Sequence, residues 1–164
     1  MIRAAFRRLV RSLPKAALFA PFYGAAVTAS VVVHMVRHDQ AYGLRMLAVI
    51  ILFALGGTVG GFLAWVVAAT VAGARPRSAR FAAMSFTLIL GTAGITAFFF
   101  FLQYRLYYAQ WHDQSFSEMW IVQMLFTGAS AVYIFAVSGL RMLLPFGLLV
   151  LFGAALIFAR KPRG

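Results

Sequence analysis

Residues 46–72 read MLAVIILFALGGTVGGFLAWVVAATVA, a run without one charged side chain. A helix needs roughly 20 apolar residues to cross the hydrocarbon layer of a bilayer, because each residue adds only about 1.5 Å of rise. Further long apolar stretches occur at Ala16–Val36, Phe81–Leu102 and Met119–Ala159. The sequence therefore predicts an all-α integral membrane protein, a polytopic helical bundle threaded several times through the bilayer.

The composition of the chain agrees with this class. Hydrophobic residues make up 63% of the 164 residues, charged residues 11%, and the mean hydropathy is +0.90. In a typical soluble domain about a quarter of the residues are charged. The chain has no cysteine, which excludes disulfides and thiolate metal sites. Its net charge of +12 comes mainly from Lys and Arg beside apolar stretches, where they set topology and contact lipid head groups, so we expect no nucleic-acid partner.

Three parts follow from this pattern. Residues 1–15 form a basic amphipathic segment, residues 16–159 a single transmembrane domain, and residues 160–164 a basic tail. Proline lacks a backbone N–H and crowds the preceding turn. We therefore expect Pro14 to end a short surface helix before the first span.

The last apolar stretch, Met119–Ala159, is too long for one span, since a straight helix of that length would measure about 60 Å. We expect the chain to fold back near Pro145, which gives five transmembrane helices. The alternative is four spans plus a re-entrant segment, which would bring the basic tail to the cytoplasmic side. The positive-inside rule places the N-terminus and Gly73–Arg80 in the cytoplasm, in a cell inner (cytoplasmic) membrane.

The tripeptide His-Asp-Gln occurs twice, at residues 38–40 and 112–114. Each copy precedes a span that is expected to run inward, and the similarity continues into those spans. One interpretation is a duplicated helical hairpin, a parallel repeat with a pseudo-two-fold axis along the membrane normal. Coincidence in a sequence of low complexity is the other.

The topology gathers every histidine and carboxylate at the outer face. These candidates for a metal site are His34, His38, Asp39, His112, Asp113 and Glu118. Zinc requires such ligands to converge to about 2.0–2.2 Å, and a haem would need two facing imidazoles. The simpler interpretation is that polar residues collect in the few loops. We expect no metal and no cofactor, with His112 close enough to His34 and His38 to form a hydrogen-bonded network that ties two loops together.

An aromatic stripe follows the third apolar stretch. Its residues recur at i, i+3, i+4 and i+7 and therefore share one helix face: Tyr104, Tyr107, Tyr108 and Trp111. They form either a docking surface for a partner or lipid, or an aromatic belt at the membrane interface.

Four glycines in the second apolar stretch form two overlapping pairs spaced by four residues: Gly56, Gly57, Gly60 and Gly61. Small residues let two membrane helices approach closely. The expected counter-surfaces are Gly91, Gly94, Gly128, Ala129 and Ala131. Packing within the bundle and self-association are both compatible with this pattern.

No catalytic motif stands out, and the middle third of each span has no ionisable residue, which pumps and coupled carriers generally need. We therefore expect a small accessory or scaffold subunit of an inner-membrane protein complex, not an enzyme, which acts by helix packing and by contact with lipid and other subunits. The alternatives are a small transporter or channel built on the duplicated hairpin, and a metal- or haem-binding protein that uses the outer cluster.

Overall fold

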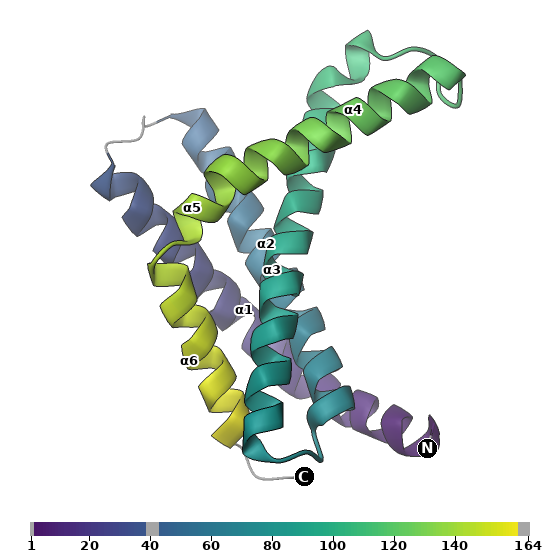
Figure 1. The fold of residues 1–164 in the computed structure, drawn as a ribbon. Helices are drawn as coiled ribbons and strands as arrows, with labels where there is room; N and C mark the ends of the chain where they lie inside the picture. The colour runs from purple at the N-terminus through teal and green to yellow at the C-terminus, as the bar shows by residue number, and fades with distance from the viewer. Residues whose placement is uncertain (1, 39–42, 161–164) are drawn as a thin grey trace.

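The computed structural model describes residues 2–38 and 43–160, and these are almost entirely helical (Figure 1). Four helical stretches are long and apolar enough to cross a membrane: Phe6–Arg37, Met46–Ala72, Arg77–Trp111 and Glu118–Leu143. A further apolar helix, α6 (Phe146–Arg160), has 15 residues. The all-α multi-pass membrane class predicted from the sequence is confirmed.

Helix α1 (Ile2–Arg37) is one helix of 36 residues that continues through Pro14. The expected helix end at Pro14 is therefore wrong. Ser12 and Ala16, on either side of the proline, are both buried, and the Ser12 hydroxyl donates a 2.7 Å hydrogen bond to the Leu9 carbonyl oxygen. Packing on both sides thus supports the helix where the proline removes a backbone hydrogen bond.

Helix α2 (Leu44–Ala72) packs between α1 and α3 (Arg77–Tyr108), and its glycines lie at both contacts. Gly57 and Gly61 face α1, whereas Gly56 and Gly60 face α3. A Cβ on Gly60 would lie 2.5 Å from the Gly91 carbonyl oxygen. Side chains larger than hydrogen would keep the backbones apart, so these glycines allow the close packing of the three helices.

The α2–α3 turn, residues 73–76, marks one end of the bundle, which we call the turn end. The N-terminal half of α1 reaches toward it, since the Phe19 and Trp65 ring centroids lie 4.7 Å apart. Helix α6 begins with Gly147 against Ser30 of α1 and ends with the Phe158 ring on Trp65. The start of α1 and the end of α6 therefore both lie near the turn end (Figure 1).

The last apolar stretch reaches the turn end in two pieces. The first piece combines α4 (Glu118–Ile134), a π-helical turn η2 (Phe135–Gly139) and α5 (Leu140–Leu143). The chain changes direction next to Pro145, as expected, but α6 then continues toward the turn end and does not return to the opposite end within the described residues. This path fits the alternative of four long spans and a shorter segment, although the shorter segment is a single helix and not a hairpin.

The two helical hairpins pack differently. Helices α1 and α2 approach so closely that a Cβ on Gly57 would lie 3.1 Å from the Gly24 Cα. Helix α4 instead crosses α3 obliquely and diverges from it (Figure 1), and the buried part of α4 is Ala131 alone. The predicted repeat of one hairpin is therefore not reproduced in the packing, and part of its first His-Asp-Gln copy lies outside the described residues.

Candidate docking groove between α3 and α4

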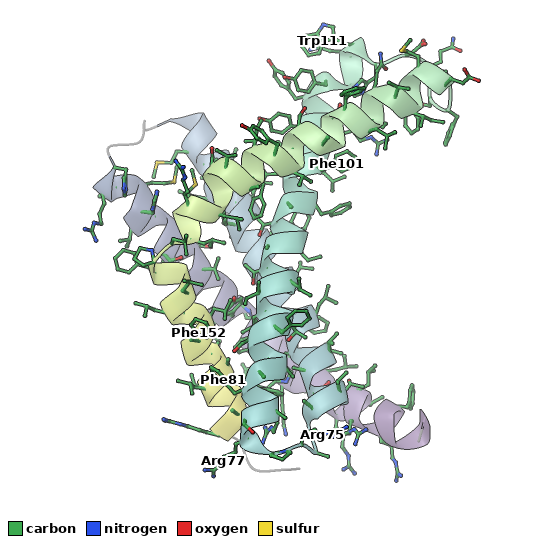
Figure 2. The ribbon with its side chains drawn as sticks, viewed as in Figure 1. Arg75, Arg77, Phe81, Phe101, Trp111 and Phe152 are labelled. Atoms are coloured by element: carbon green, nitrogen blue, oxygen red, sulfur yellow. The ribbon has the colours of Figure 1, made fainter. Side chains whose placement is uncertain are left out.

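An apolar groove of about 620 Å³ opens where α4 crosses α3. Phe101 of α3 lies at this crossing (Figure 2). The groove is lined by one face of each helix: Gly94, Ala97, Phe98 and Phe101 from α3, and Trp120, Ile121, Met124, Leu125, Gly128, Ala129 and Val132 from α4. None of these residues is charged, and all of them are glycine or carry an apolar or aromatic side chain. The groove therefore suits an apolar partner.

The glycines that line the groove leave open space in it, because they have no side chain. A Cβ on Gly94 would meet no atom within 4 Å, and a Cβ on Gly128 would meet only the Phe101 ring, at 3.7 Å. Together with Ala129, these glycines were expected to pack against the glycines of α2. Among the expected glycines Gly91 does so, because its Cβ position lies 2.7 Å from the Gly60 carbonyl oxygen, whereas Gly94 and Gly128 have no atom of α2 within 4 Å of theirs.

Polar contacts on the connection between α3 and α4 fix the start of α4. The Ser117 side chain caps the helix by accepting a 3.0 Å hydrogen bond from the Trp120 N–H. The Asp113 N–H donates to the Gln123 side-chain oxygen at 2.9 Å. The connection is thus bound to the Gln123 side of α4, which leaves the Trp120 side free to line the groove.

The predicted aromatic stripe is a ladder of rings in contact with one another. Ring centroids lie 6.0 Å apart for Tyr104 and Tyr108, 5.8 Å for Tyr108 and Trp111, and 5.7 Å for Tyr107 and Trp111. The ladder runs along the end of α3 and through the 3-10 turn η1 (Ala109–Trp111). Trp111 lies beyond the groove, at the end opposite to the turn end (Figure 2), and most of the ladder is exposed.

The predicted outer cluster is divided. His34 and His38 stack with their ring centroids 4.2 Å apart, and the His38 Nδ1 lies 2.9 Å from the His34 carbonyl oxygen. His112 lies instead on the α3–α4 connection, with its Nε2 3.4 Å from the Thr127 hydroxyl. The expected network between His112 and the other two histidines is therefore wrong, because α4 diverges and carries this connection away from the end of α1 (Figure 1).

The described acidic residues of the predicted outer cluster do not join the histidines in a metal site. Asp113 caps the backbone N–H of Gln114 at 2.8 Å, and Glu118 is exposed in the first turn of α4. Asp39 lies outside the described residues. Among residues 2–38 and 43–160, no three His, Asp or Glu side chains come together as a metal site requires.

The groove was not predictable from the sequence. Its residues were recognisable as apolar, but the sequence does not say which helix faces remain uncovered after packing. Comparison with known proteins adds no functional information: no protein-family model, no curated protein and no solved structure matches this chain.

Proposed function

We propose that this protein is a small accessory or scaffold subunit of a membrane-protein complex, and that a transmembrane helix of another subunit occupies the α3–α4 groove. The observation that carries the proposal is the contrast between two glycines one turn apart on α3. A Cβ on Gly91 would lie 2.7 Å from the Gly60 carbonyl oxygen, whereas a Cβ on Gly94 would meet open space. Gly94 opens into the same groove as Gly128 and Ala129 of α4, and none of the described residues fills that space. The open glycine of α6, Gly153, has no such neighbours in the groove.

A partner helix explains these small residues better than lipid does. Glycine inside a helix is about 1 kcal/mol less favourable than alanine. Close approach of a second helix offsets that cost through van der Waals contacts along the backbone. Flexible lipid chains pack against large side chains as well as against small ones, so they give no reason for Gly94, Gly128 and Ala129 to line one groove.

The size of the groove also suits a helix. On α4 its lining runs from Trp120 to Val132, which corresponds to about 18 Å of helix. This is more than half of the roughly 30 Å hydrocarbon thickness. A helix in the groove would continue outward past the aromatic ladder, where Tyr108 and Trp111 offer rigid rings to a segment that leaves the membrane.

We place the complex in a cell inner (cytoplasmic) membrane with the turn end in the cytoplasm. Arg75, Arg77 and Arg160 lie at that end, and cytoplasmic flanks of membrane helices are enriched in such residues. The groove and the aromatic ladder then open toward the outer half of the membrane.

Photocrosslinking in native membranes tests the proposal. A photoreactive residue in place of Leu125, which lines the groove and is 68% exposed, should form a discrete adduct with another membrane protein. The matched control is Leu149 on α6, which is 69% exposed but does not line the groove. It should give lipid adducts only.

Two glycine variants sharpen the test. Gly94→Leu should fold normally and abolish the Leu125 adduct, because the new side chain would fill the groove. Gly153→Leu on α6 adds the same side chain into equally open space outside the groove and should leave the adduct intact. The accessory role is excluded if Leu125 and Leu149 both give only lipid adducts, and also if Gly94→Leu leaves the protein adduct unchanged.

A further inference from the structure

One face of α1 changes from apolar to basic near the turn end. Leu18 and Phe22 on this face are 69% and 71% exposed. Continuing toward the N-terminus at steps of three and four residues, the exposed side chains are Lys15, Arg11 and Arg7. Residues three or four apart share a helix face. Apolar side chains are therefore followed directly by cationic side chains along one stripe of α1.

The segment that carries these cations also has an apolar side. Phe6, Val10 and Leu13 are exposed, and their spacing of four and three residues places them along one edge next to the basic stripe. This N-terminal part of α1 projects beyond α2, α3 and α6 (Figure 1). An exposed helix with adjoining basic and apolar faces has the pattern of a membrane-surface helix.

Other cations lie at the same end, and none of the described residues there is an Asp or a Glu. Arg75 and Arg77 are exposed at the α2–α3 turn (Figure 2), and Arg160 is exposed at the end of α6. The sequence has no Asp or Glu before residue 39, between residues 39 and 113, or after residue 118. The turn end therefore presents an uncompensated positive field, and its complement is an anionic surface.

We infer that residues 6–15 of α1 bind the phosphate head groups of anionic phospholipids through Arg7, Arg11 and Lys15. Phe6, Val10 and Leu13, on the adjoining edge of this segment, contact the lipid beside those head groups. The step from Leu18 to Lys15 lies at the boundary between hydrocarbon and head groups and sets the depth of α1 in the bilayer.

Lipid selectivity measured by electron paramagnetic resonance tests this inference. The full-length protein is reconstituted in phosphatidylcholine vesicles that contain spin-labelled phosphatidylglycerol or spin-labelled phosphatidylcholine. The protein should immobilise the anionic label in preference to the zwitterionic one, by roughly twofold or more. Raising the ionic strength should reduce this preference, because salt screens exposed charges.

Two double variants separate the stripe from charge in general. Arg7→Gln with Arg11→Gln should lower the preference clearly toward one, although Lys15 and the cations of the α2–α3 turn remain. Arg105→Gln with Arg141→Gln removes the same charge from exposed positions away from the turn end and should retain the preference of the unmodified protein. Circular dichroism verifies that both variants remain helical. Equal immobilisation of the two labels by the unmodified protein overturns the inference, as does an equal loss of preference in the two double variants.

Discussion

The Arg80 guanidinium donates a 2.7 Å hydrogen bond to the Phe158 carbonyl oxygen and lies 5.1 Å from the centroid of the Phe158 ring. Arg80 is buried in the first turn of α3, and Phe158 is near the end of α6. The last carbonyl groups of a helix have no partner within it. Arg80 therefore satisfies one of these groups and holds the end of α6 against α3 at the turn end.

Replacing Arg80 by leucine should loosen α6. A hydrogen bond from a charged donor contributes about 1.5–3 kcal/mol, so the free energy of unfolding in detergent micelles should fall by roughly that amount. Trypsin should also cut after Arg160 more rapidly. Arg77→Leu, on the exposed side of the same helix turn, is the matched control and should change neither quantity. Equal effects of the two substitutions would contradict the role given to Arg80.

Gly60→Leu should prevent the folding of the three-helix core. The new side chain would meet the Gly91 backbone, which cannot move aside without separating α2 from α3. We expect aggregation or a melting temperature lowered by many degrees, as size-exclusion chromatography and thermal unfolding would measure. Gly94→Leu, with nothing within 4 Å, should elute and melt like the unmodified protein. A stable Gly60→Leu protein would refute this account of the α2–α3 contact.

Tyr23 of α1 and Thr92 of α3 form a buried hydrogen bond, with 2.9 Å between the Tyr23 hydroxyl and the Thr92 Oγ1. Interhelical hydrogen bonds in membrane proteins contribute about 0.6 kcal/mol on average. A double-mutant cycle of Tyr23→Phe and Thr92→Val should therefore give a coupling energy of about this size. Additive effects of the two substitutions would mean that the bond contributes nothing to stability.

Because the chain has no cysteine, introduced cysteines can report the path of α6 across the membrane. Cysteines at Ser78 and Arg160 should react with an impermeant thiol reagent from the same side, since Arg80 and Phe158 are in contact. A cysteine at Ser115, on the α3–α4 connection, should react from the opposite side. Labelling of Arg160→Cys and Ser115→Cys from one side would contradict the path of α6 described above.

Helix positions were predictable from the sequence because the thickness of a bilayer fixes them. The apolar run at residues 46–72 matches α2 within two residues, since charge and turn-forming residues bound the run on both sides. The glycines of that run were also identified correctly as small residues at close spacing. The expected contact with Gly91 of α3 is confirmed, but the contact of Gly57 and Gly61 with α1 was not predicted, because the same pattern serves any helix that approaches.

The candidate groove and the division of the histidines could not be predicted for a related reason. Placing His112 beside His38 assumed that the second hairpin packs like the first. The orientation of a membrane helix depends on its packing against neighbours, which local sequence does not encode. The Phe101 ring against Gly128 and the hydrogen bond between Asp113 and Gln123 direct α4 away from α3. Neither contact has a signature in spacing or composition.

The position of α6 has a consequence for biosynthesis. This helix lies against both α1 and α3 (Figure 1), yet the ribosome makes it after all the other described helices. While α4 enters the membrane, the surfaces of α1 and α3 that α6 will cover are still exposed. The hydrogen bond between Arg80 and the Phe158 carbonyl oxygen has not yet formed. We expect quality-control proteases of the membrane to recognise chains stalled at this stage, so that the docking of α6 marks the passage from nascent chain to mature subunit.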